Sequence, residues 1–170
     1  MTTDLRLRPL RPDDEAEFAA AHEAMAAEGF TFGLTYEPGR SWVDYLRQLD
    51  RHRRGAGLPD GWVPTTLLAA DVGGRIVGRT SIRHELNDRL LREGGHIGYA
   101  VLKEHRRRGY ATEILRQSLV VVRALRAGPV LVTCDDDNVG SATVIERCGG
   151  VFDSLSTGDD GQPVRRYWFS

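Results

Sequence analysis

The chain has 170 residues and a mass of 18.9 kDa, which is the size of one domain and enough to bury a sizeable core. Its 23 Lys and Arg residues nearly balance its 24 Asp and Glu residues. The net charge of −1 argues against a protein dedicated to nucleic acid or anionic membranes, which would need a large basic excess. The hydrophobic fraction of 41% argues against disorder, and no apolar run approaches the roughly 20 residues that span a bilayer.

The cysteines and the N-terminus favour an intracellular protein. The first residues lack the apolar stretch of a signal peptide, so we expect a cytoplasmic location. Cys134 and Cys148 have no partners at metal-binding spacing, which predicts reduced, buried thiols and no metal site. Lys103 is the one lysine among the 23 basic residues, and arginine supplies the other 22, as is typical of GC-rich coding. Arginine also suits phosphate contacts, so any local cluster is of interest.

The first half of the chain is predicted to form an edge strand at 5–7, a helix at 12–29, a second helix from Ser41, and a β-hairpin at 66–82. A Gly- and Pro-rich loop at 53–64 precedes the hairpin. The second helix carries one apolar stripe, interpreted as core or as the wall of a lid, at Trp42, Tyr45, Leu46 and Leu49.

The second half is predicted to form a strand at 96–102, a helix at 110–126, a buried strand at 130–133, a short helix at 139–147 and a final hairpin at 151–169. The inward face of the long helix is predicted to be Ala111, Ile114, Leu115, Ser118, Val122 and Leu125. A hairpin that leads into a strand–helix–strand unit indicates an α/β fold, with a central mixed sheet and helices on both faces. No linker divides residues 1–170, so we expect a single domain.

The most informative segment is the apolar strand that ends in the basic turn Arg106–Arg108 and opens through Gly109 directly into a helix. Such a turn presents free backbone N–H groups, and the helix dipole adds partial positive charge. Gly109 leaves room for a phosphate near the backbone, and the arginines can add charge-assisted hydrogen bonds. These features predict a phosphate or pyrophosphate site. The alternative is a solvated basic turn that only begins a helix.

The hexapeptide from Arg106 to Ala111 fits the Q/R-x-x-G-x-G/A signature of GNAT-type N-acetyltransferases, which hold the coenzyme A pyrophosphate on this turn. The preceding strand Ile97–Val101 and the segment from Asn138 to Phe152 also resemble motifs of this family. The resemblance extends over nearly the whole chain and is strongest to a bacterial subgroup of predicted acetyltransferases. It implies a GNAT-like acyl-CoA N-acyltransferase fold.

The resemblance also implies which residues bind acetyl-CoA. Strand residues Tyr99, Ala100 and Val101 would contact the pantetheine arm, and the Val101 amide would polarise the thioester carbonyl. Asn138 would contact the arm where two parallel strands splay apart, or would simply cap a helix, and both roles are compatible. The implied coenzyme-binding set is Tyr99, Ala100, Val101, Arg106, Arg107, Arg108, Gly109, Tyr110, Ala111, Thr112, Asn138 and Ser141.

The sequence indicates the general base and the general acid less clearly than it indicates the coenzyme site. His96 stands where many relatives carry a glutamate base, and imidazole titrates near neutral pH; its alternative role is a structural bond beside the Gly94-Gly95 turn. The family's usual general-acid tyrosine falls here on Ile145, so the sequence departs from the pattern. The candidates left for this role are Tyr99, Tyr110, Ser141 or a water, unless no acid is needed. Cys148 is interpreted as structural, and Asp135–Asp137 either attract a cationic amine or are solvated.

Three functions follow from these patterns. The first is an acetyl-CoA-dependent N-acetyltransferase that acts on an amine by direct attack in a ternary complex. The second is a non-catalytic acyl-CoA-binding regulatory module, favoured by the missing tyrosine. The third, an RNA-associated protein, conflicts with the net charge and with the absence of interleaved aromatic residues. The amine side would be built from the first two helices, loops 30–40 and 53–64, and the final hairpin. Homodimers are common in this fold, so the resemblance allows one.

Overall fold

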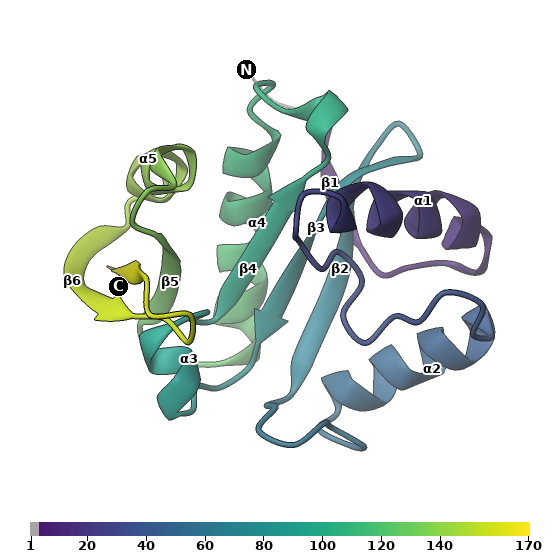
Figure 1. The fold of residues 1–170 in the computed structure, drawn as a ribbon, viewed down its shortest axis with the longest axis horizontal. Coiled ribbons are helices and arrows are strands. Elements are labelled where there is room, and N and C mark those ends of the chain that lie inside the picture. The colour runs from purple at the N-terminus through teal and green to yellow at the C-terminus, as the bar shows by residue number, and fades with distance from the viewer. Residues whose placement is uncertain (1–3) are drawn as a thin grey trace.

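The computed structural model describes residues 4–170, and Figure 1 shows their arrangement. The order of strands and long helices predicted from the sequence is confirmed. The elements are β1 (Arg6–Arg8), α1 (Glu15–Ala26), α2 (Trp42–Arg53), β2 (Thr65–Val72), β3 (Arg75–Arg83), α3 (Asp88–Arg92), β4 (Ile97–Val101), α4 (Tyr110–Leu125), β5 (Val130–Asp135), α5 (Val139–Arg147), β6 (Val151–Thr157) and β7 (Pro163–Phe169). The short helix α3 was not predicted, since five residues are too few to show helical periodicity.

The α/β fold class is confirmed, with strands arranged in two antiparallel sheets. The first sheet has the order β1-β2-β3-β4, and the second has the order β5-β7-β6. The continuous mixed sheet expected from the sequence is therefore interrupted between β4 and β5. Because β4 is the last strand of the first sheet, one of its edges faces this interruption.

Helices α1 and α2 cover one face of the first sheet (Figure 1). Phe18 of α1 packs against Phe32, Trp42 and Tyr45, with ring centroids 5.4–5.9 Å apart. The apolar stripe of α2 is confirmed as core: Trp42 and Tyr45 are buried, and Leu46 and Leu49 pack against the same cluster. No helix within residues 4–170 has the length and apolarity needed to cross a membrane.

Helix α4 packs on the opposite face, because the residues of β2 and β3 that point away from α1 contact it. Ile114, Leu115, Ser118 and Val122 are buried, as predicted. The prediction for Leu125 is wrong: it is 46% exposed at the last turn, where the helix passes the sheet. Leu119 is buried in its place, since it is one turn below Leu115.

The backbones of the two sheets meet at His96, next to a hydrogen bond from the Gly94 N–H to the Thr133 hydroxyl. The backbone N–H of His96 donates to the Leu131 carbonyl at 2.8 Å, and the Leu131 N–H donates back to Nδ1 of the His96 ring at 2.9 Å. The ring is 1% exposed. No further backbone hydrogen bond links β4 to β5 in the described residues, so the two strands are held at this point and separate beyond it.

We predict that His96 makes the folded protein less stable in acid. Burial lowers the pKa of His96 to about 4, so the neutral ring stabilises the fold fully above the unfolded value of about 6.5. As the pH falls from about 6.5 to about 4, His96 is protonated in the unfolded chain but not yet in the folded protein. The unfolded state is therefore favoured, and the stability contributed by the neutral ring is lost. The His96→Asn variant, which keeps an acceptor for Leu131 but does not titrate, should lose less stability across this window in urea unfolding experiments.

The variant His96→Ala leaves the buried Leu131 N–H without an acceptor, which should lower the free energy of unfolding by about 1–3 kcal/mol. The cavity left by the imidazole ring should lower it further. The other buried or half-buried histidines are unchanged in both variants, so they cancel in the comparison. An identical pH dependence for wild type and His96→Asn would contradict the assignment.

Candidate functional site

The free edge of β4 is the first component of the site. Antiparallel strands alternate between residues that bond the neighbour and residues that point away from it. The Arg83 N–H donates to the His96 carbonyl, and the Leu102 N–H donates to the Val77 carbonyl, so even-numbered residues of this stretch face β3. The backbone groups of Tyr99 and Val101 therefore face the gap beside β5.

This alternation corrects the role expected of Ala100. Its backbone groups point at Arg79 on β3, so they are not offered to a ligand in the gap. The Val101 carbonyl is also occupied, because it accepts a hydrogen bond from Nε of Arg106 at 3.0 Å. The Val101 N–H is left as a donor at the edge, as the predicted role in polarising a carbonyl requires.

The N-terminus of α4 is the second component. Gly109 precedes the helix with a φ of +81° and makes no side-chain cap, so the first N–H groups of α4 point outward without an intrahelical partner. A Cβ at Gly109 would meet nothing within 4 Å. The left-handed backbone favours glycine at this position, and the space beside its Cα is open. Arg107 is also left-handed, with a φ of 62°.

The three arginines of the turn have different surroundings. Arg106 has contacts within the fold: its guanidinium pairs with Glu28, in the turn after α1, at 2.5 Å, and also donates to the Val101 carbonyl. These bonds use its Nε and parts of its Nη groups, although the side chain still lines the cleft and is 42% exposed. Arg107 and Arg108 are exposed and have no side-chain hydrogen bond within residues 4–170. Of these two, only Arg107 lines the adjacent cleft.

That cleft has a volume of about 430 Å³ and lies between the start of α4 and one face of α5. It brings together seven predicted residues: Val101, Arg106, Arg107, Gly109, Tyr110, Ala111 and Thr112. Four residues that the sequence reasoning missed also line it: His105, Gly140, Val144 and Arg147. The last three recur at helical spacing on α5, so a search for polar residues on the face below Asn138 would have found Arg147.

The start of α5 closes the gap from the other side. Asn138 caps α5, with its Oδ1 accepting the Ser141 N–H at 3.0 Å, so the helix-cap role weighed for it is present. The Ser141 hydroxyl lies 3.3 Å from the Tyr99 hydroxyl and links β4 to α5 across the gap. Burial raises the pKa of Tyr99 to about 12, so its hydroxyl remains protonated at neutral pH.

His96 does not have the surroundings of a general base. Its Nδ1 accepts the Leu131 N–H, so the ring proton resides on Nε2, which is buried without a partner. A base needs an accessible nitrogen with a free lone pair, and the lowered pKa further weakens this ring as a proton acceptor. The structure therefore favours the alternative structural role and corrects the predicted one.

Other predicted groups are structural. Ile145 is fully buried, so the place of the expected tyrosine belongs to the core. Cys134 is buried, and Cys148 is half-buried with its Sγ 3.6 Å from the Thr112 carbonyl. Asp136 pairs with Arg165 at 2.7 Å. Within residues 4–170, no cluster of three His, Cys, Asp or Glu side chains could hold a metal ion.

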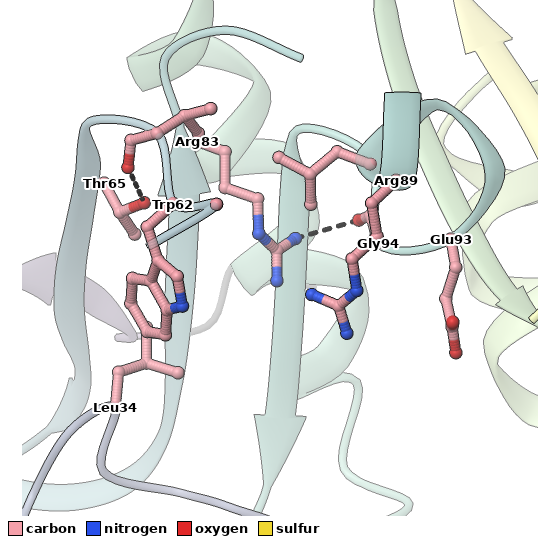
Figure 2. A pocket seen from close by; sticks show the side chains of 10 residues that line it. Leu34, Trp62, Thr65, Arg83, Arg89, Glu93 and Gly94 are labelled. Atoms are coloured by element: carbon pink, nitrogen blue, oxygen red, sulfur yellow. Dashed lines mark hydrogen bonds between the residues drawn. The ribbon is translucent and has the colours of Figure 1, made fainter. Parts of the chain in front are cut away.

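A second cavity, of about 310 Å³, lies on the opposite face of the sheet. Figure 2 shows its walls: Leu34 and Trp62 on one side, Arg89 and Glu93 on the other, and the Arg83 guanidinium between them. Leu34 and Trp62 belong to loops 30–40 and 53–64, which the sequence assigned to the amine side.

Comparison with known proteins identifies the family and the fold. Residues 4–151 match the family model described as an acetyltransferase (GNAT) domain. An acetyltransferase from Agrobacterium tumefaciens has 23% identity and a TM-score of 0.65, covering 100% of this chain and 93% of its own. Mycobacterium smegmatis RimJ, solved with CoA-disulfide, has 19% identity and a TM-score of 0.69, covering 97% and 81%.

A third solved structure is spermidine N-acetyltransferase from Vibrio cholerae in complex with CoA and spermine. It has 18% identity and a TM-score of 0.63, covering 98% of this chain and 95% of its own. The search of curated protein sequences gives no match. The strand edge, the uncapped helix start and the match over residues 4–151 lead to one conclusion: the chain belongs to the GNAT acetyltransferase family.

Proposed function

We propose that the protein transfers an acetyl group from acetyl-CoA to a primary amine by direct attack in a ternary complex. The observation that carries the proposal is the cleft that begins at the Val101 N–H and ends at the uncapped start of α4. It combines the two contacts that an acyl-coenzyme needs, namely a donor for the thioester carbonyl and an anion site for the pyrophosphate.

The anion site would bind the pyrophosphate through backbone and side-chain donors together. The first N–H groups of α4 supply aligned dipoles, while Arg107 and Arg147 approach from opposite walls of the cleft. Arg106 contributes indirectly, since its bonds to Glu28 and Val101 hold the turn against α1 and β4.

The strand edge would position the reacting end. The Val101 N–H would donate to the thioester oxygen, on which negative charge develops as the amine attacks. The Tyr99 hydroxyl is protonated at neutral pH, and it points into the same gap from β4. It is our choice for the group that protonates the leaving thiolate, in place of the tyrosine absent at Ile145.

The amine would enter from the other face, through the cavity of Figure 2. His96 is not assigned as the base, because its ring bonds to Leu131 and is buried. The amine would therefore reach the thioester already neutral, or lose its proton to water. This predicts a rate that rises with pH toward the pKa of the amine itself.

The second candidate is a non-catalytic acyl-CoA-binding module, and the buried His96 and the apolar Ile145 are what favour it. Both candidates bind the coenzyme in the same cleft. Release of free coenzyme A in a panel of amines separates them, because only the enzyme turns over.

We expect acetyl-CoA to raise the melting temperature, since a ligand that binds only the folded state stabilises it. Arg107→Gln and Arg147→Gln should each weaken binding about tenfold or more through loss of a charge-assisted contact. Both side chains are exposed, so the melting temperature without ligand should not change.

The matched control is Arg47→Gln on α2, whose side chain is 76% exposed and far from the cleft in sequence and fold. It should bind acetyl-CoA like the wild type. No thermal shift at millimolar acetyl-CoA would overturn both candidate functions, and unchanged affinity in the two cleft variants would remove the arginines from the site.

Tyr99→Phe should lower kcat by about a hundredfold, the lower end of the usual contribution of a general acid, with the KM for acetyl-CoA changed little. Tyr167→Phe removes a tyrosine hydroxyl that bonds Glu146 outside both cavities, so it serves as the control and should stay within about threefold. Steady-state kinetics at saturating amine measures both. If Tyr99→Phe is fully active, Tyr99 is not the group that protonates the leaving thiolate, and water supplies that proton.

A further inference from the structure

Arg83 is an incompletely bonded cation at the centre of the second cavity. Its Nη1 donates to the Gly94 carbonyl at 2.9 Å and to the Gly95 carbonyl at 3.2 Å, which fixes the guanidinium on the turn before β4 (Figure 2). Nε and Nη2 have no hydrogen-bond partner within residues 4–170. These two nitrogens form one edge of the guanidinium, and that edge presents two parallel N–H groups.

No carboxylate of the described residues neutralises this arginine. Glu93 lines the cavity, but its Oε2 accepts the Asp159 N–H at 2.8 Å, and Arg83 forms no salt bridge. Arg89 adds a second positive charge to the wall, although it pairs with Asp159 at 2.6 Å. Burial lowers the pKa of Arg83 to about 10, which still leaves it charged at neutral pH. Partial burial of a guanidinium that has no carboxylate partner costs free energy, and a bound anion would offset that cost.

The cavity adjoins the reacting segment of β4. A Cβ placed on Gly98 would lie 3.4 Å from Nη2 of Arg83 and 3.2 Å from Oγ of Ser81, so the guanidinium lies close against the strand at this glycine. Gly98 directly precedes Tyr99, whose hydroxyl faces the gap on the other side. A ligand anchored on Arg83 would therefore lie against β4 near Gly98, three residues before the Val101 N–H that is proposed to polarise the thioester, on the face opposite the coenzyme cleft.

We propose that Arg83 selects acceptors that carry a carboxylate near the reacting amine, binding it through the Nε–Nη2 edge. The planar Nε–Nη2 edge can bind a carboxylate in a bidentate manner. Leu34 and Trp62, which line the cavity wall, would contact the apolar part of the acceptor. Two arginines in the wall oppose polycations such as polyamines. This inference rests on the proposed acetyl transfer and specifies its substrate class.

The test compares amines that differ only by a carboxylate: tyramine with tyrosine, and cadaverine with lysine, with spermidine as the polycation. A third arm pairs short peptides with free N-termini and either Asp or Lys at the second position, and this distinguishes free amino acids from peptides as the source. We expect kcat/KM at least about tenfold higher for the carboxylate-bearing member. Equal rates, or a preference for cadaverine or spermidine, would overturn the inference.

Variants then locate the preference. Arg83→Gln should lower kcat/KM for the carboxylate-bearing acceptor by about ten- to a hundredfold and change that of its partner amine little. Arg83→Lys keeps the charge but not the paired N–H groups, so its loss should be intermediate. Arg47→Gln is the matched control. A carboxylate preference that survives in Arg83→Gln would overturn the assignment to Arg83.

The readouts separate this inference from the proposed function. If no amine releases coenzyme A, acetyl transfer itself fails. If amines react but the carboxylate makes no difference, only the role of Arg83 fails. Acetyl-CoA binding, followed by thermal shift, should be the same in Arg83→Gln and wild type and shows that the variant is folded. Should that variant not fold, the wild-type comparison of matched amines still decides the question.

Discussion

The architecture depends on one side chain that stands in for a backbone group. In a continuous sheet, the Leu131 N–H would bond a carbonyl of the neighbouring strand, but here it bonds the Nδ1 of His96. With the return bond from the His96 N–H, this makes a two-bond joint between sheets that otherwise have no backbone hydrogen bond in the described residues. Because the joint ends there, the later part of β4 has a free edge, and a free edge is what a site for an extended ligand requires.

Arginine side chains near this connection between the sheets have different structural roles. Arg79 is fully enclosed and donates to the carbonyls of Thr31, Phe32 and Gly98, so it ties the loop after α1 to β3 and β4. Arg106 ties the turn before α4 to the turn after α1 in a similar way. Arg83 is half-buried and keeps one edge of its guanidinium unbonded. A cluster of arginines in a sequence therefore does not identify which members hold the fold and which face a ligand.

The fold was predictable because its signals are local. The glycine turn between β2 and β3, the stripe beginning at Trp42, and the Gly109 turn each depend on residues close in sequence, and each was placed correctly. The anion turn was predictable for the same reason, because a strand, a glycine and a helix start follow one another in the chain.

The individual roles were less predictable because they depend on contacts between distant residues. His96 was assigned a proton-transfer role by its position, while its actual partner is 35 residues away. Nothing in the local sequence indicates that Arg106 pairs with Glu28, which lies 78 residues earlier. Arg147 was missed because it enters the cleft only once α5 packs beside α4. Single-sequence reasoning has no access to such pairings.

The two cavities have no lining residue in common. The coenzyme cleft is made by the turn before α4 and by α5, whereas the Arg83 cavity is made by loops, α3 and the end of β3. Substitutions in one set should combine almost additively with substitutions in the other, because residues without shared partners rarely couple. Loops tolerate change better than helix starts and strand edges do. Under the proposed assignment, the acceptor specificity can therefore change through loop substitutions that leave the acetyl-CoA cleft intact.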